Sequence, residues 1–279
     1  MFRFIKPKKV FFVIYSLVIF TFIILISFRQ VKLNEEIQKN RIISVNKTLP
    51  NIYAIYFPQF HKDPLNDKLW GPGFTDWNNL NAAKIKNRKG NTILRPTSEL
   101  GYYDLLDVAI RKKQATLANR YGINGFIYHH YWFYHEGLGA SMKGMIEKIL
   151  VDNEPNIKFA FNWAQESWTN TWNGQFKRAS TKTIILMEQK IPNPDSPLVK
   201  EHYMFLRNFF HHPNYILVNG CPLFLVYGNS QDPKVLAVRK KLKKLAIEDG
   251  FPSPGLHLNI IVYKLTIIFI ILYNYRLKL

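Results

Sequence analysis

The stretch I-K-F-A-F-N-W-A-Q-E-S-W-T-N-T-W-N-G, residues 157–174, joins a predicted strand to a cluster of polar and aromatic side chains. Its first five residues, Ile157–Phe161, form a short apolar run that predicts a buried strand. The rest places one carboxylate, Glu166, among three tryptophans and several amides. Aromatic rings cover the apolar face of a sugar while amides bind its hydroxyls, so the stretch predicts a carbohydrate site directly after a strand.

The same succession of an apolar run and polar or aromatic residues recurs along the chain. Further strand-like runs are predicted at residues 52–57, 125–128, 222–227 and 256–262. Amphipathic helical patterns lie between the strands, at residues 105–121, 142–150, 198–210 and 233–247. Alternating strands and helices favour a parallel sheet covered by helices. Polar residues after the strands favour a (β/α)₈ barrel, whose sites gather at the carboxyl ends of its strands. A doubly wound open sheet is the alternative, although no glycine-rich phosphate loop follows a predicted strand.

The N-terminal region carries a membrane signal. Val10–Phe28 is an uncharged, almost wholly apolar run, long enough to cross a bilayer as a helix. Charged and bulky residues follow it, so we expect an uncleaved signal anchor and not a signal peptide. The N-glycosylation sequon Asn46-Lys47-Thr48 favours an exoplasmic main domain. The sequence thus predicts a single-pass type II membrane protein whose main domain faces the Golgi lumen or another lumenal side of the secretory pathway.

The predicted domain organisation follows from these segments. It comprises a cytoplasmic tail at 1–9, the anchor at 10–28, a stem at 29–50, the barrel domain at 51–258 and an apolar tail at 259–279. Only five strand-and-helix rounds fit within residues 51–258, so the barrel is expected to be incomplete at its C-terminus. The apolar tail has no acidic residue, and we interpret it as translated non-coding sequence or the end of a truncated gene model.

Composition argues against several kinds of partner. The net charge of +19 suits nucleic acid, but nine of the lysines and arginines lie in the first 47 residues, so no nucleic-acid partner is predicted. The single cysteine, Cys221, lies in an apolar run and is expected to be a buried thiol. His129 and His130 are adjacent and would point to opposite faces of a strand, so no metal site is predicted. No cofactor is evident.

Five motifs carry a family resemblance. They are A-I-Y-F-P-Q-F-H (54–61), N-D-K-L-W-G-P-G-F-T-D-W-N-N (66–79), E-L-G-Y-Y-D-L (99–105), Y-G-I-N-G-F-I-Y-H-H-Y-W-F (121–133) and the tryptophan-rich segment 162–174. In this order and spacing they resemble the WbsX-type glycosyltransferase family of polysaccharide biosynthesis proteins, over residues 51–258. That family is similar to glycoside hydrolase family 99, the endo-α-mannosidase group of (β/α)₈ barrels. The resemblance implies glycan synthesis or trimming, and it leaves transfer and hydrolysis both open.

The sequence departs from the family pattern at three motifs. It has F-T-D-W at 74–77, W-A-Q-E at 163–166 and W-N-G at 172–174, where the family has F-T-E-W, W-A-N-E and W-D-G. The side chain of Asp76 is one methylene group shorter than the glutamate of the family motif, and Asn173 lacks the charge of the family's aspartate. Two further interpretations therefore stay open, namely a carbohydrate-binding pseudoenzyme and a gene fragment without a stable product.

The candidate site residues follow from the chemistry of a glycosidic bond. Two carboxyl groups usually share its cleavage or formation, and Glu166 and Asp76 are the candidates. The tryptophans around Glu166 are expected to raise its pKa toward that of an acid catalyst. The residues expected to bind sugar are His61, Trp70, Trp77, His129, Tyr131, Trp132, Asn162, Trp163, Gln165, Trp168, Trp172 and Tyr227.

Overall fold

The computed structural model describes residues 29–33, 35, 51–83, 90, 92, 94–135, 138–170, 182–227, 231–253, 256–261 and 269–272. The predicted anchor at residues 10–28 lies outside them, and no helix among the described residues is long and apolar enough to span a bilayer. Two compact units divide the chain, and Asn51–Leu272 forms the one that contains the sheet.

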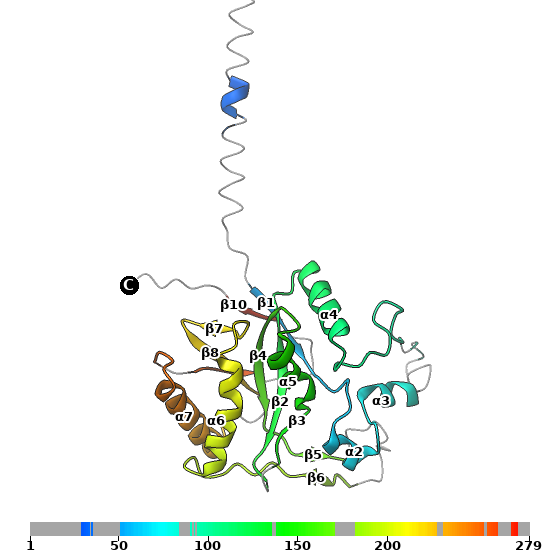
Figure 1. Ribbon diagram of the computed structural model, residues 1–279, viewed down its shortest axis with the longest axis vertical. Helices are drawn as coiled ribbons and strands as arrows, with labels where there is room; N and C mark the ends of the chain where they lie inside the picture. Colours follow the sequence, from blue (N-terminus) through cyan, green and yellow to red (C-terminus); the bar gives the residue numbers. More distant parts are fainter. Residues whose placement is uncertain are drawn as a thin grey trace, which may run out of the picture. The chain divides into compact units, whose positions relative to one another are not determined.

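A parallel sheet forms the centre of this unit (Figure 1). Its neighbouring strands are, in order, β1 (Asn51–Tyr56), β2 (Gly125–Phe133), β4 (Lys158–Ala164), β8 (Cys221–Tyr227) and β9 (His257–Ile261). An antiparallel strand, β10 (Phe269–Leu272), pairs with the free edge of β1. Parallel strands that neighbour each other in chain order confirm the predicted α/β sheet. Its closure into an eight-stranded barrel stays a prediction.

Short strands extend the sheet at both ends. β3 (Gly139–Ser141) pairs antiparallel with the carboxyl end of β2, and β7 (Leu217–Val218) pairs antiparallel with the amino end of β8. β5 (Trp168–Thr169) and β6 (Ile185–Met187) form a separate two-stranded ribbon.

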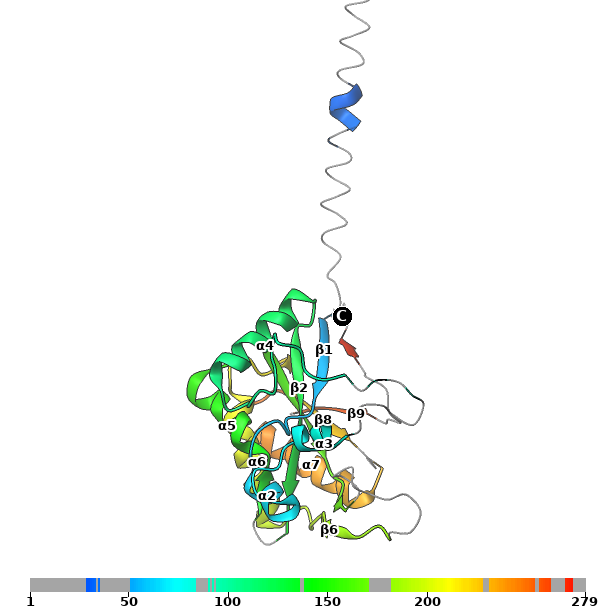
Figure 2. The same cartoon turned by 90° about the vertical axis from the view of Figure 1, so that its right-hand side faces the viewer.

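Helices connect the parallel strands. The principal ones are α4 (Val108–Arg120), α5 (Lys143–Asp152), α6 (Pro197–Phe210) and α7 (Pro233–Glu248). Two short helices, α2 (Pro64–Trp70) and α3 (Asp76–Ala82), lie in the connection from β1 to α4. Figure 2 shows α4, α5 and α6 on one side of the sheet. The ends of these helices follow local chemistry: α4 begins after Asp107, for example, because the Asp107 carboxylate accepts the Ala109 N–H and caps the helix.

Side chains alternate between the two faces of the sheet. Phe161 on β4 and Phe224 on β8 face α6, with the Phe161 ring 5.0 Å from Phe209 and the Phe224 ring 6.1 Å from Phe210. Tyr56 on β1 faces α4, where its hydroxyl donates to Gln114 at 3.2 Å. The main hydrophobic core therefore lies between the sheet and its helices, and the opposite face is free to carry other chemistry.

The structure corrects one prediction about strand ends. Residues 129–132 and 162–163 were expected to follow their strands, but they lie within β2 and β4. The reason is pairing: β3 holds the end of β2 in extended form, with Tyr131 opposite Ser141 and Phe133 opposite Gly139. Consecutive residues in these stretches therefore point to opposite faces of the sheet.

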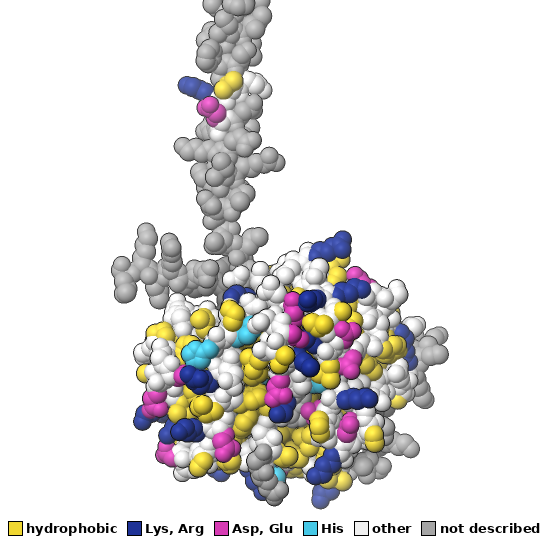
Figure 3. Space-filling view, in the orientation of Figure 1, with side chains coloured by type: hydrophobic (Ala, Val, Ile, Leu, Met, Phe, Trp, Pro, Cys, Tyr) yellow, Lys and Arg dark blue, Asp and Glu magenta, His cyan; other side chains and the backbone are white. Residues whose placement is uncertain are grey.

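A basic run at residues 239–244 lies on α7. Lys241 forms an ion pair of 2.8 Å with Asp195, and Lys244 lies 3.9 Å from Glu248 one turn along the helix. Figure 3 shows basic and acidic side chains interspersed over the face in view. Exposed pairs of this kind contribute little to stability but favour solubility.

Candidate functional site

The face of the sheet opposite the helices carries a group of polar and aromatic side chains. His129 on β2 lies opposite Asn162 on β4, and the Asn162 amide nitrogen lies 3.5 Å from His129 Nδ1. The Tyr227 ring at the end of β8 is 5.3 Å from the imidazole, and Phe57 meets it edge-on at 5.7 Å. Neighbouring parallel strands therefore bring three of the predicted sugar-binding residues together.

Tyr131 lies two residues beyond His129 and so faces the same way. Its ring stacks on Phe133 at 6.2 Å and meets Trp168 edge-on at 5.2 Å. Tyr131 is 1% exposed and Trp168 is 3% exposed. Trp168 therefore supports Tyr131 from beneath and offers no open ring to a ligand.

Glu166 follows the end of β4 by two residues and reaches solvent. Partial burial raises the pKa of its carboxyl group. Burial also raises the pKa of the Tyr131 and Tyr227 hydroxyls, and the charge of Glu166 adds to both effects. The charge of Glu166 therefore makes both hydroxyls harder to ionise.

Asp76, the second predicted carboxylate, lies in the connection from β1 to α4. It is the first residue of α3, and its backbone N–H donates to the Gln59 carbonyl at 3.0 Å. Burial raises the pKa of Asp76, while the Asn79 amide, at 3.4 Å, opposes that shift. Its charge contributes to the raised pKa of Tyr131. The charges of both predicted carboxylates therefore contribute to the raised pKa of Tyr131.

Several polar atoms near this group have unmet hydrogen-bonding capacity. Asn162 Oδ1 and both amide atoms of Gln165 are buried without a partner among the described residues. An unpaired buried polar group costs about 1–3 kcal/mol, so such groups are uncommon unless a ligand or water completes them. Sugar hydroxyls, which both donate and accept, have the required chemistry.

Trp132 and Trp163 lie on the opposite face, in the core against α6. Trp132 stacks on His202 at 4.6 Å with an interplanar angle of 8°. Trp163 is fully buried, with its ring 6.1 Å from Tyr134 and 6.4 Å from Phe224. Their positions do not support the predicted sugar contact, because strand alternation turns them toward the helices, and we treat both as packing residues.

Trp70 and Trp77 lie in the connection between β1 and α4, and both are partly exposed. The Trp77 indole N–H donates to the Tyr103 carbonyl at 2.7 Å, and its ring lies 4.6 Å from Phe60. Trp70 lies 5.9 Å from Phe74. Trp77 directly follows Asp76 in the sequence, and Trp70 lies six residues before it. The ring contacts given above join both tryptophans to aromatic residues of this connection and not to the group on the sheet.

His61 is buried beneath the first turn of α5 and is 2% exposed. Its Cδ2 lies 3.3 Å from where a side chain on Gly144 would begin, so glycine is what lets the helix pass over the imidazole. Burial lowers the His61 pKa, although the Asp63 charge opposes this effect. His61 is thus a packed, neutral side chain. The last predicted residue, Trp172, lies outside the described residues.

Asp63, which no sequence motif singled out, links α2 to the start of α5. Asp63 is 5% exposed and accepts hydrogen bonds from the N–H groups of Leu65, Asn66 and Met142. It caps α2 and holds that helix to the start of α5. A local signal was available, because an Asp-Pro pair is typical of a helix N-cap and first turn.

Metal binding finds no support in the part of the chain that the structure describes. Within it, no three or more His, Cys, Asp or Glu side chains come together in a way that would hold a metal ion. His130, the neighbour of His129, faces the core as strand alternation predicts, with Nε2 2.9 Å from His202 Nε2.

Comparison with known proteins decides the family. Residues 52–264 match the family described as Glycosyltransferase WbsX. The chain belongs to this family. Two relatives named uncharacterized protein WxcX, from two strains of Xanthomonas campestris pv. campestris, are each 31% identical over 212 residues, or 75% of this chain. The WbsX chain described here spans only 28% of the length of these curated relatives.

Solved structures share some of the arrangement. An endo-α-mannosidase of glycoside hydrolase family 99 from Bacteroides thetaiotaomicron, in complex with bis-tris propane, is 16% identical with a TM-score of 0.35, covering 64% of this chain and 42% of its own. A glycoside hydrolase-like protein is 16% identical with a TM-score of 0.37, covering 77% and 51%. At these values the likeness supports no inference about activity.

Proposed function

We propose that this WbsX chain forms or cleaves glycosidic bonds at the group of residues around Tyr131. The observation that carries the proposal is the polar group that β2, β4 and β8 bring together, in which the Asn162 amide nitrogen lies 3.5 Å from His129 Nδ1 and the Tyr227 ring lies 5.3 Å from the imidazole. The charges of Glu166 and Asp76 both contribute to the raised pKa of Tyr131 on the same strand face. Asn162 Oδ1 and the Gln165 amide atoms are buried without a partner among the described residues and supply hydrogen bonds for a sugar. Membership of the glycosyltransferase family supports the same class of substrate.

The proposed chemistry uses the two carboxyl groups in complementary roles. One carboxylic acid donates its proton to the leaving oxygen, and the other carboxylate stabilises the positive charge that develops at the anomeric carbon. Glu166 is our candidate for the acid, because burial raises its pKa and it still reaches solvent to recover a proton. Asp76 is the candidate for the stabilising carboxylate. The His129 and Tyr227 side chains, which contact each other, would form one surface against which the sugar lies.

The proposal extends to the whole chain. We place the catalytic domain in a (β/α)₈-type barrel, of which five parallel strands are seen in chain order. We further propose that Val10–Phe28 anchors it in a membrane as a type II protein, with the domain on a lumenal face of the secretory pathway such as that of the Golgi. Protease treatment of intact microsomes checks the topology, since digestion of residues 51–258 would contradict it.

Substitution of the carboxylates tests the activity. The full chain would be incubated with a panel of oligosaccharides, with and without activated sugar donors, while new reducing ends and extended chains are measured. Glu166→Gln and Asp76→Asn should each lower turnover by about 10²–10⁴-fold, the usual contribution of a general acid or base. Glycan binding should persist in both variants, because the amides and aromatic rings remain.

Matched controls are available at exposed positions away from the group. Glu201 on α6 and Asp195 are both exposed, so Glu201→Gln and Asp195→Asn should leave turnover unchanged. Unchanged turnover in Glu166→Gln would remove Glu166 from the mechanism. Glycan binding by the unmodified chain, without turnover of any substrate, would instead favour a carbohydrate-binding protein.

A further inference from the structure

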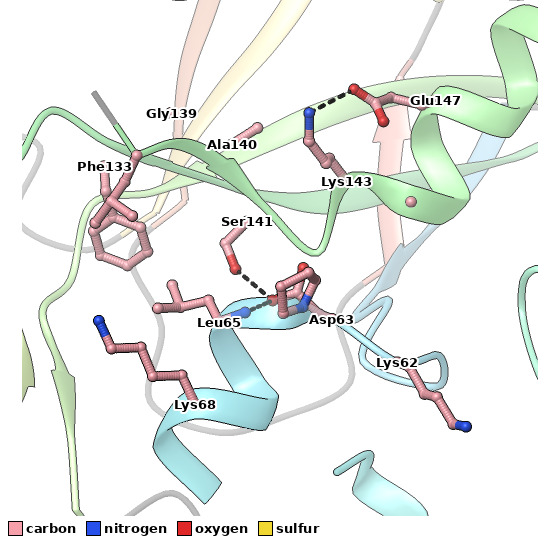
Figure 4. A pocket seen from close by; sticks show the side chains of 13 residues that line it. Lys62, Asp63, Leu65, Lys68, Phe133, Gly139, Ala140, Ser141, Lys143 and Glu147 are labelled. Carbon is pink, nitrogen blue, oxygen red and sulfur yellow. Dashed lines mark hydrogen bonds and ion pairs between the residues drawn. The ribbon is translucent and has the colours of Figure 1, made fainter. Parts of the chain in front are cut away.

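A second hollow lies beside the candidate site, between α2, β3 and the start of α5 (Figure 4). Its volume is about 440 Å³, within the range of about 300–1,000 Å³ that is typical of small-molecule sites. Leu65, Phe133 and Leu138 form an apolar part of its wall. None of the residues that line it is among those assigned to the candidate site.

One aromatic ring separates the cavity from that site. Phe133 lines the cavity, yet its ring also stacks on Tyr131 at 6.2 Å and meets Trp168 edge-on at 5.3 Å. Both partners belong to the candidate site. Phe133 is therefore part of a buried aromatic wall that the cavity and the candidate site share.

The cavity is lined by more positive than negative charge. Lys62, Lys68 and Lys143 contribute three ammonium groups, and Glu147 pairs with Lys143 at 3.0 Å. Figure 4 shows the Lys68 side chain on the same side as Phe133, with Lys143 and Glu147 on the other. Within the described part of the chain, no acidic group is paired with Lys62 or Lys68.

The other acidic residue that lines the cavity, Asp63, already accepts hydrogen bonds from groups of the protein. Oδ1 accepts from Leu65 N, Asn66 N and Ser141 Oγ, and Oδ2 accepts from Met142 N at 2.8 Å. A carboxylate saturated in this way is held in place by four donors and is not available to neutralise the lysines. The cavity thus combines an apolar wall with ammonium groups that a ligand is free to bind.

We infer that this cavity binds an acidic sugar residue of the glycan substrate, through the anionic group that the residue carries. The C–H face of the ring would lie against Leu65 and Leu138, and Lys68 and Lys143 would bind a carboxylate or a phosphate on the ring. The inference rests on the proposed function, because it names a second subsite for the same glycan. It makes the protein selective for charged chains.

Direct binding measurements on the full chain test this assignment. The probes are a tetrasaccharide containing one glucuronic acid and a neutral tetrasaccharide with glucose in its place, titrated calorimetrically at low salt. The charged chain should bind about tenfold more tightly, and the advantage should shrink as ionic strength rises. The double variant Lys68→Gln/Lys143→Gln should lose this advantage and keep its affinity for the neutral chain.

Three further measurements separate the possible outcomes. Lys148→Gln, on the same helix as Lys143 but outside the cavity, should retain the advantage; an equal loss there, or equal binding of both tetrasaccharides, would overturn the inference. Competition by glucuronate or by glucose 6-phosphate decides between carboxylate and phosphate, and failure of both also overturns it. Asn162→Leu should weaken both tetrasaccharides equally; if it has no effect, the proposed function fails while the charge-dependent subsite stands.

Discussion

Asp63 Oδ2 accepts a 2.8 Å hydrogen bond from the backbone N–H of Met142, which lies 79 residues further along the chain. Oδ1 of the same carboxylate caps α2. One buried side chain therefore joins the connection after β1 to the turn that leads from β3 into α5. Because β3 also holds the end of β2 extended, this contact helps to place Tyr131 and Phe133.

Replacing Asp63 with alanine should destabilise the protein strongly. The change removes a helix cap, worth about 1 kcal/mol, and leaves buried N–H groups unpaired at about 1–3 kcal/mol, so we expect a loss of about 2–4 kcal/mol. Urea unfolding followed by circular dichroism would measure it. Asp107→Ala is the matched control, since Asp107 caps α4 from an exposed position, and it should cost only about 1 kcal/mol. Equal losses in the two variants would show that the link to Met142 adds nothing.

Gly125 is expected to be irreplaceable at the start of β2. A Cβ atom there would lie 2.3 Å from the Lys158 carbonyl oxygen and 2.9 Å from the Tyr53 ring, so β2 would have to separate from both neighbours. Gly125→Ala should cost about 3 kcal/mol, at the upper end of ordinary overpacking. Gly144→Ala meets only side-chain atoms at 3.3 Å and should cost less. A melting temperature for Gly125→Ala equal to that of the unmodified protein would contradict the prediction.

The buried histidines should make the fold sensitive to mild acid. Burial lowers the pKa of His129 to about 4 and that of His130 to about 3, and it also lowers the pKa of His202. Below pH 6.5 the unfolded chain binds protons that the folded chain does not. The free energy of unfolding should therefore be greatest above pH 6.5 and fall on acidification, by up to about 1.4 kcal/mol per pH unit for each histidine.

Denaturant titrations at pH 7.5, 6 and 5 would measure this decline. His130→Leu removes one of the titrating groups, so its free energy of unfolding should fall less steeply with acidification than that of the unmodified protein. A free energy of unfolding that is constant from pH 7.5 to pH 5 would show that these histidines are protonated as readily in the folded state as in the unfolded one.

Tyr131→Phe is expected to affect activity more than stability. The ring and its contacts with Phe133 and Trp168 remain, while the hydroxyl whose pKa is raised by the charges of Glu166 and Asp76 is lost. If the hydroxyl binds one of these carboxylates during turnover, as the proposed function requires, the rate should fall by about tenfold to a hundredfold. As a positioning residue, Tyr131 should also alter the pH dependence of the rate, a change that a purely structural role would not produce.

The acid role of Glu166 predicts the direction of that pH dependence. The acid is active when protonated, and burial raises its pKa above the ordinary value, so turnover should decline as pH rises through the raised pKa. In Glu166→Gln the residual rate should lose this alkaline decline. If the decline persists in Glu166→Gln, another group is the acid.

The positions of the parallel strands were predictable because they depend on local patterns of apolar residues. The runs at residues 52–57, 222–227 and 256–262 correspond closely to β1, β8 and β9, since strands buried on both faces read as continuous apolar segments. The tryptophan-rich motifs were likewise enough to indicate the family. Both kinds of signal lie within short stretches of sequence.

The direction of individual side chains was decided only by the sheet. Trp132 and Trp163 belong to the motifs that indicate sugar binding, but strand pairing turns them into the core, while His129 and Tyr131 face the other way. The influence of both the Asp76 and the Glu166 charge on Tyr131 likewise depends on the tertiary fold. The sequence by itself determined the α/β sheet and the family, and it named the two carboxylates proposed for the chemistry, because local composition encodes these features. Only the tertiary structure decided which aromatic residues face that chemistry, because a shift of one residue along a strand reverses the face.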